Sequence, residues 1–162
     1  MTIPFYPIPL DPHPEAVKVV EMNFTSNSSG NHIWTMNDQT YRGNYNDPLL
    51  LLANRNEDPN NSSIYDPEWL VYNFGSAKTV RIVLNNAYQA WHPMHLHGYH
   101  MQVIAEGDGY WDGTITNPSN PLRRDTHIIR RYGHLVIQFQ ADNPGIWPYH
   151  CKSSRPIPRV LC

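Results

Sequence analysis

Hydrophobic and polar positions alternate along much of this chain in short runs separated by turn-forming residues. Such alternation is typical of strands, because successive side chains of a strand point to opposite faces. About eight runs recur at a spacing of roughly ten residues, which predicts an all-β antiparallel sandwich or barrel. The predicted strands cover residues 17–24, 32–37, 68–74, 78–86, 99–107, 126–131, 134–140 and 146–151. The run PLLLLANRN, residues 48–56, fits a short helix or a buried strand equally well.

The two ends of the chain depart from this pattern. Five prolines among the first 14 residues predict an extended linker over residues 1–14. Residues 15–151 are expected to form one domain, since a chain of 162 residues can bury a single sizeable core. The sequence KSSRPIPRVLC has two prolines and no alternation, so residues 152–162 are expected to form an atypical tail.

Charge and composition exclude several classes of partner. With 12 basic and 14 acidic residues the net charge is −2, which gives no reason to expect nucleic acid or an anionic membrane surface. No apolar run approaches the length of a membrane span, and the first residues lack the layout of a signal peptide. Four glycosylation triplets nevertheless favour a fragment of a secreted glycoprotein; they begin at Asn23, Asn27, Asn60 and Asn61.

The segment WHPMHLHGYH, residues 91–100, concentrates four histidines in ten positions. In a strand, His95 and His97 share one face, while Leu96 points into the core. Pro93 bends the start of the segment, so that His92 projects elsewhere, and His100 lies on the face opposite His97. Because neutral imidazole is the commonest metal ligand, the paired histidines favour a metal site over a solvent-exposed strand.

The dipeptide His150-Cys151 adds a thiol to these imidazoles. Adjacent strand residues face opposite ways, so the two side chains can reach two different metal centres. Thiolate combined with imidazole suits copper. Taken alone, Cys151 is better explained as a buried space-filling residue, and a disulfide with Cys162 stays open.

The histidine-rich segment and the second motif together resemble a known family. HPMHLHGYHMQVIAEG followed by DNPGIWPYHC resembles the C-terminal plastocyanin-like (cupredoxin) domain of the multicopper oxidases, and of fungal laccases in particular. The segments MNDQTYRGNYNDPLLL, GDGYWDGT and NPLRRDT are similar to laccase sequence as well, so the resemblance extends over roughly residues 15–151. It implies a cupredoxin-like Greek-key β-sandwich.

The resemblance also implies a role for each donor residue. His92 and Cys151 match ligands of the type 1 (blue) copper, His95 matches a ligand of the type 2 copper, and His97 and His150 match ligands of the type 3 coppers. The family oxidises phenols or related small donors at the blue copper. Electrons then pass through the Cys-His link to a trinuclear copper cluster, where dioxygen becomes water.

The chain departs from the family pattern immediately after Cys151. The family motif continues H-C-H-I-x-W-H, whereas Lys152 stands at a type 3 ligand position and Pro156 at a type 1 ligand position. An ammonium group has no lone pair to donate, and proline has no side-chain donor. The H-W-H-G and second H-x-H motifs of the family's first domain are also absent. Activity is therefore expected to be weak or absent unless preceding cupredoxin domains complete the cluster.

Two other functions remain open. One is a non-catalytic module that binds copper through His92, His95, His97 and His150. The other is a cupin-type metal oxygenase, which also uses an H-x-H pair in a β-barrel. A cupin would need a carboxylate such as Glu106 and a further histidine, His127 or His134, but it would leave DNPGIWPYHC unexplained.

Overall fold

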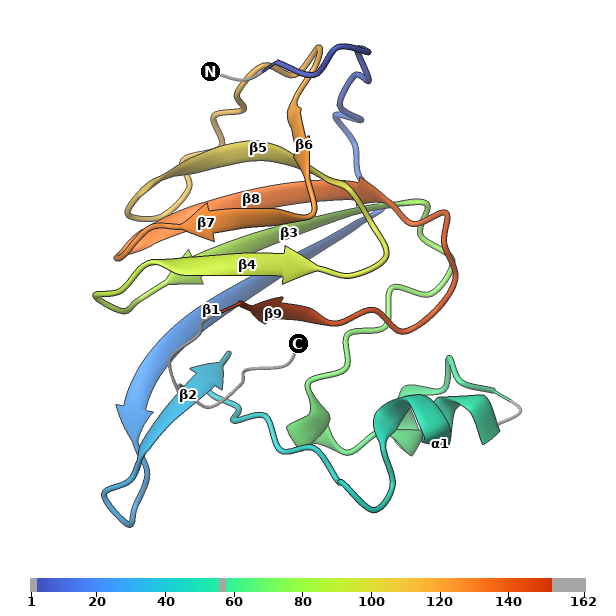
Figure 1. Cartoon of the computed structure of the whole chain (residues 1–162), viewed down its shortest axis with the longest axis vertical. Coiled ribbons are helices and arrows are strands. Elements are labelled where there is room, and N and C mark those ends of the chain that lie inside the picture. Colours follow the sequence, from blue (N-terminus) through green and yellow to red (C-terminus); the bar gives the residue numbers. More distant parts are fainter. Residues whose placement is uncertain (1–2, 56–57, 153–162) are drawn as a thin grey trace.

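The structure, a computed structural model, describes residues 3–55 and 58–152 and contains two β-sheets (Figure 1). A six-stranded sheet has the order β2-β1-β3-β8-β5-β6, and a three-stranded sheet has the order β7-β4-β9. The strands are β1 Ala16–Ser26, β2 His32–Met36, β3 Thr79–Asn86, β4 His92–Leu96, β5 Met101–Asp108, β6 Leu122–Arg124, β7 Thr126–Ile129, β8 Gly133–Gln140 and β9 Tyr149–Cys151.

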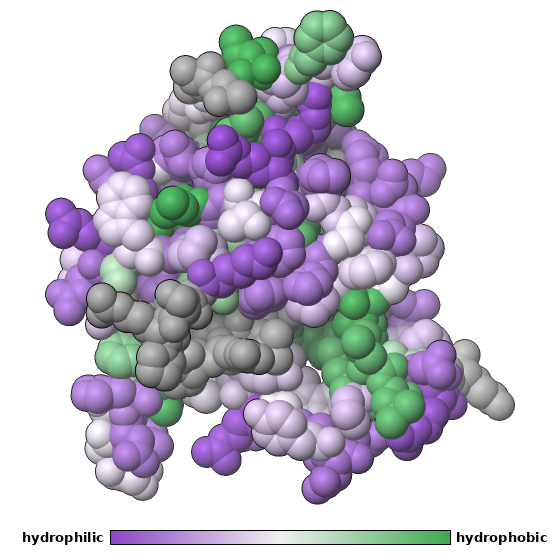
Figure 2. Space-filling model, viewed as in Figure 1, coloured by the Kyte–Doolittle hydropathy of each residue, from purple (hydrophilic) through white to green (hydrophobic). Residues whose placement is uncertain are grey.

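Among the described residues, helical structure is confined to the connection between β2 and β3. It comprises the α-helix α1 Leu49–Arg55 and the 3₁₀ helices η1 Ser62–Ile64 and η2 Pro67–Trp69. The ambiguous leucine run is therefore a helix, but none of its residues is buried, and Leu50 remains 60% exposed. Figure 2 shows hydrophobic surface beside α1. Within residues 3–55 and 58–152, no helix has the length and hydropathy needed to cross a bilayer.

The main core lies between the two sheets. Alternate residues of β4 are buried, and Met94 and Leu96 pack in one cluster with Leu84 of β3 and Leu135 of β8. Burying each such aliphatic side chain contributes about 1.5–3 kcal/mol relative to leaving it in water. This packing holds the three-stranded sheet against the larger one and so fixes where β4 and β9 lie.

The outer face of the six-stranded sheet is also covered, which explains why all eight residues of β3 are buried. Leu10, from the N-terminal segment, packs there against Val83, Ile104 and Val136. The backbone carbonyl of Asp11 accepts hydrogen bonds from Gln138 Nε2 at 2.9 Å and from the Arg81 guanidinium at 3.4 Å. The end of the proline-rich segment therefore packs along the sandwich through Leu10 and Asp11.

One predicted strand, residues 68–74, is wrong. Asp66 caps the start of η2, since its side chain accepts a hydrogen bond from the Glu68 amide at 2.9 Å, and Pro67 occupies the first turn. Leu70 then adopts a left-handed conformation with φ of 51°, which ends the helix without starting a strand. Local capping chemistry therefore overrode the β propensity of EWLVYNF.

The sandwich is not antiparallel throughout. Strands β1 and β3 pair in parallel, with Val20 opposite Leu84, although every other strand pair is antiparallel among the described residues. A parallel pair needs a long crossover, and the connection through α1, η1 and η2 supplies it. The sequence carried no signal for this, because both pairings present the same alternation.

Candidate metal centre

Strands β4 and β9 bring the two distant histidine motifs together. They pair antiparallel, with Met94 opposite Cys151 and His95 opposite His150. Since side chains alternate along both strands, Cys151 lies on the core side with His92, whereas His150 lies on the opposite face with His95. Two sets of donor atoms therefore lie on opposite faces of the three-stranded sheet. The peptide bond between His150 and Cys151 connects them.

The first set is buried. His92 is 2% exposed, and its Nδ1 lies 3.5 Å from Cys151 Sγ. Bonds of about 2.0 Å to nitrogen and 2.3 Å to sulfur would place the two donors at such a separation across one metal ion. The His92 ring also packs edge-on against Trp34, with centroids 4.9 Å apart. This contact fixes the ring plane and excludes water from one side.

Burial sets the protonation of both groups. It lowers the pKa of His92, which favours the neutral imidazole that a metal requires. It raises the pKa of the Cys151 thiol, so the metal-free sulfur keeps its proton. Metal binding at this pair must therefore displace the thiol proton, and it becomes tighter as pH rises.

The second set consists of His95, His97 and His150. One nitrogen from each ring lies within 4.8 Å of the others, and the Nε2 atoms of His97 and His150 are 2.9 Å apart. Two imidazoles bound to one ion at about 2.0–2.1 Å can adopt this spacing. His97 follows the last residue of β4 and is held by a 2.9 Å hydrogen bond from its amide to the Pro148 carbonyl. Unlike the first set, this one opens to solvent, because His97 is exposed.

The β6–β7 connection orients His95. Its Nδ1 lies 2.8 Å from the Asp125 carbonyl oxygen and 3.0 Å from Thr126 Oγ1. A carbonyl can only accept, so Nδ1 carries the hydrogen and Nε2 keeps its lone pair for a metal. Sequence analysis did not identify Thr126 as a functional residue, because only the register between β4 and β7, with His95 opposite Thr126, reveals it.

Lys152 lies beside the second set. Its amide donates to the Pro93 carbonyl at 2.8 Å, and its side chain is exposed. Burial lowers the pKa of His97, and the nearby His95, His150 and Lys152 charges lower it further. The ammonium of Lys152 makes the smallest of these contributions, and it also repels an incoming cation. Cys162 and Pro156 lie outside the described residues.

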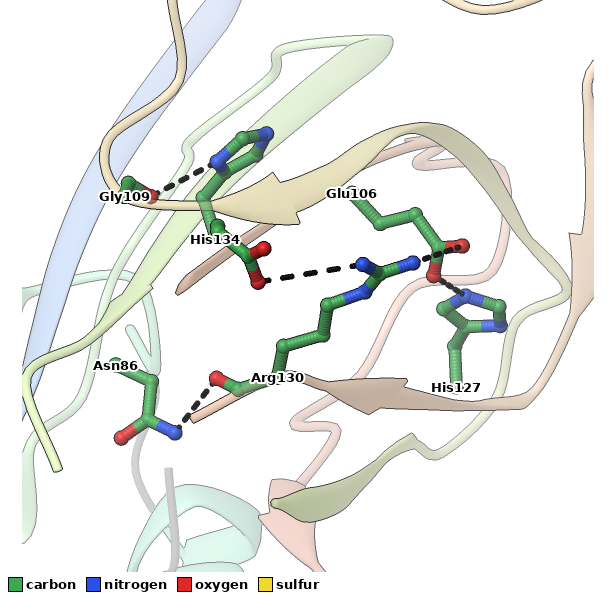
Figure 3. A network of polar contacts seen from close by, with 7 residues as sticks. Asn86, Glu106, Gly109, His127, Arg130 and His134 are labelled. Atoms are coloured by element: carbon green, nitrogen blue, oxygen red, sulfur yellow. Dashed lines mark hydrogen bonds and ion pairs between the residues drawn. The ribbon is translucent and has the colours of Figure 1, made fainter. Parts of the chain in front are cut away.

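The cupin arrangement does not form. Glu106 Oε2 lies 2.6 Å from His127 Nε2, in a network with Arg130 (Figure 3). His134 Nδ1 instead bonds to the Gly109 carbonyl at 2.9 Å. Within residues 3–55 and 58–152, the only group of three or more potential metal ligands comprises the three histidines of the second set, with no carboxylate. Arg123 and Arg124, the paired arginines before Asp125, make no ion pair in this part of the chain.

Comparison with known proteins agrees with the geometry. A family model described as multicopper oxidase matches residues 11–155. The chain belongs to the multicopper oxidase family. It is 32% identical over 150 residues to the iron transport multicopper oxidase FET3 of Saccharomyces cerevisiae, covering 85% of this chain and 24% of that protein. It is 34% identical over 154 residues to Laccase-1 of Botryotinia fuckeliana, covering 92% and 25%.

The solved structures confirm the expected fold. The crystal structure of Fet3p, a multicopper oxidase that functions in iron import, superposes with a TM-score of 0.71 at 30% identity, covering 91% of this chain and 30% of that one. This multicopper oxidase domain therefore has the all-β cupredoxin-like Greek-key fold. The chain spans about a quarter of the length of the curated relatives it matches.

The donor chemistry fits copper, the metal that the family implies. On the buried side a soft thiolate and an imidazole converge, and this combination of donors suits copper. His92 Nε2 is buried without a hydrogen-bond partner among the described residues, so Nδ1, the nitrogen near the sulfur, is the one with a defined neighbour. On the open side, three imidazoles converge without a carboxylate, a donor set that also suits copper.

Substituting Thr126 by valine is expected to weaken copper binding by the second set roughly tenfold, the lower end of the range for loss of a partner that orients a ligand. Valine keeps the shape but removes the oxygen near His95 Nδ1, while the Asp125 carbonyl remains. Competition against a chelator of known affinity measures the change. Unchanged affinity in a correctly folded variant would show that the carbonyl alone orients His95.

Proposed function

We propose that this chain is the copper-binding domain of a laccase-type multicopper oxidase, an enzyme that oxidises phenolic or related donors and reduces dioxygen to water. The proposal rests on one observation, the convergence of two donor sets on opposite faces of one sheet. His92 and Cys151 form one set, and the three histidines of the second set form the other. A single dipeptide contributes to both.

The proposal assigns the buried set, His92 and Cys151, to type 1 copper. It assigns His95 to type 2 copper, and His97 and His150 to type 3 copper. Bound copper would supply one-electron acceptance at the thiolate and four-electron reduction of dioxygen at the cluster. The protein's part is to hold the donors apart by one peptide bond, to keep His92 dry against Trp34, and to fix the tautomer of His95 through the β6–β7 connection.

We propose that the chain is incomplete as a catalyst by itself. Lys152 stands where the motif has a third type 3 ligand, and Pro156 stands at the second type 1 histidine. The exposed position of His97 suits a cluster whose remaining ligands come from preceding cupredoxin domains. The functional unit is residues 15–151, between a linker over residues 1–14 and a tail over residues 152–162. A secreted, glycosylated parent protein fits the glycosylation triplets near the N-terminus.

Copper titration and oxygen uptake test this assignment together. Copper is expected to bind to the chain alone without an intense blue thiolate absorption band and without oxygen uptake on a phenolic donor. Adding preceding domains that carry the H-W-H-G and H-x-H motifs is expected to allow at most weak oxygen uptake, because Lys152 and Pro156 still leave two ligand positions without a donor. A strong blue band from the chain alone would contradict the role given to Pro156, and turnover by the chain alone would contradict its incompleteness.

The relatives include both a laccase and an iron transport oxidase. The preferred electron-donating substrate distinguishes these two activities. Completed with preceding domains, the protein is expected to consume oxygen faster with a phenol than with ferrous ion. Lys152 specifically favours a second candidate function, a non-catalytic copper-binding module, because an ammonium replaces a ligand. Tight copper binding without turnover, even with the preceding domains present, would support that module instead.

A further inference from the structure

A cleft borders the second donor set, because Asp125 and Thr126, which contact His95, line part of it. This cleft of about 830 Å³ is lined by residues of β6, β7 and the segments flanking β4, including Trp91 and His100. None of the five predicted copper ligands lines it. Small-molecule sites typically have volumes of about 300–1,000 Å³, so the cleft is large enough for a ligand of that class.

Positive charge predominates along the cleft, where three arginines face two carboxylates, Glu106 and Asp125. Glu106 is already engaged, because it contacts His127 at 2.6 Å and Arg130 at 3.9 Å (Figure 3). The Asp125 carboxylate lies 3.8 Å from His95 Nδ1. Neither carboxylate neutralises the remaining two arginines.

Those two arginines, Arg123 and Arg124, come from β6. Arg123 donates to neutral oxygens only, to Asn120 Oδ1 at 3.0 Å and to the Tyr6 carbonyl. The Arg124 side chain is exposed and makes no hydrogen bond or ion pair within the described part of the chain. Two guanidinium groups therefore border the cleft without an acidic partner, and guanidinium binds planar carboxylates through paired hydrogen bonds.

Apolar surface lies beside these charges. Trp91 is 55% exposed and Ile128 is 48% exposed, although both line the cleft. The Arg130 guanidinium stands 5.9 Å from the centre of a Trp91 ring, which holds the indole at the wall. An inorganic anion would use only the arginines, whereas a ligand with a ring would also cover the indole.

We propose that this cleft binds a small aromatic carboxylate, with the carboxylate on Arg124 and Arg123 and the ring against Trp91 and Ile128. The juxtaposition of guanidinium groups that lack an acidic partner with a half-exposed indole carries the proposal. None of the five predicted copper ligands contributes to the cleft, although Asp125 and Thr126 in its wall contact His95.

Three probes distinguish the contribution of the carboxylate from the contribution of the aromatic ring. Benzoate carries both features, benzamide has the ring without the charge, and inorganic phosphate has charge without the ring. Isothermal titration of the metal-free chain, with the indole N–H resonance of Trp91 followed by NMR, is expected to show benzoate binding at least about tenfold tighter than either comparison probe. Absence of benzoate binding would overturn the proposal, and so would phosphate binding as tight as benzoate.

Two variants locate the site. Arg124→Gln is expected to weaken benzoate binding at least about tenfold, whereas Arg131→Gln, at an exposed arginine outside the cleft, leaves it unchanged. Trp91→Leu is expected to remove the preference for benzoate over phosphate. Equal benzoate affinity in Arg124→Gln and Arg131→Gln would refute the assignment. Circular dichroism confirms that each variant is folded, and a His97→Ala variant is expected to bind benzoate normally.

Discussion

Replacing His97 by alanine is expected to abolish tight copper binding by the second donor set while leaving the fold intact. His97 supplies one of three converging imidazole nitrogens, 2.9 Å from its neighbour on His150. Loss of a direct ligand should cost more than the roughly 10–100-fold that loss of a supporting partner costs. The side chain is exposed, so unfolding free energy should change by no more than about 0.5 kcal/mol.

His100→Ala provides the matched control for this experiment. His100 is an exposed histidine three positions along the same segment, but it lies outside the converging group. Chelator competition should therefore show a large loss of copper affinity for His97→Ala and almost none for His100→Ala. Equal losses in the two variants would mean that copper binds to exposed histidines in general and that no defined site exists.

Much of the candidate site was accessible from sequence because its donors lie in two short motifs. The spacing of His95 and His97 placed both rings on one face, and adjacency placed His150 and Cys151 on opposite faces. The structure agrees with both expectations through the pairing of β4 with β9. The contact between His92 and Cys151, 59 positions apart, followed only from the family resemblance, because no local pattern encodes a long-range register.

Tertiary context decided the features that the sequence did not predict. Thr126 and the Asp125 carbonyl orient His95 only because β7 pairs with β4. The short strand β6, Leu122–Arg124, lacks the length for a periodic signal and forms by pairing with β5. The failed strand prediction over residues 68–74 has the opposite cause, since a local cap at Asp66 overrode a favourable composition. Short elements depend on their partners more than on their own residues.

The two donor sets differ in exposure and protonation, and this difference affects the order in which they bind copper. His92 packs against Trp34, and Cys151 must lose its thiol proton to bind a metal. His97, in contrast, is open to solvent on one side, and its pKa is lowered chiefly because neighbouring atoms displace part of its water. The lowered pKa of His97 favours a neutral imidazole that can accept a cation, which the nearby charge of Lys152 opposes. We expect copper to occupy the second set first and to reach the buried pair as pH rises.

The largest loss of stability is expected from Gly98→Ala, in the turn that follows His97. Gly98 has φ of +75°, a left-handed conformation that costs a residue with a side chain roughly 1–3 kcal/mol. An added Cβ would also lie 2.5 Å from Trp147 Cδ2, well inside van der Waals contact. Overpacking adds about 1–3 kcal/mol, so the total approaches roughly 2–6 kcal/mol. That is a large part of the approximately 5–15 kcal/mol that stabilises an ordinary domain.

Gly30→Ala separates strain from collision, because Gly30 has an almost identical φ of +77° with nothing within 4 Å of the added Cβ. Urea unfolding should show a loss near 1 kcal/mol for Gly30→Ala, from backbone strain alone, and a much larger loss for Gly98→Ala. Adding Trp147→Ala to Gly98→Ala should recover the collision part in a double-mutant cycle. If the two glycine variants lose equal stability, the indole moves aside without cost, and the added Cβ causes no collision.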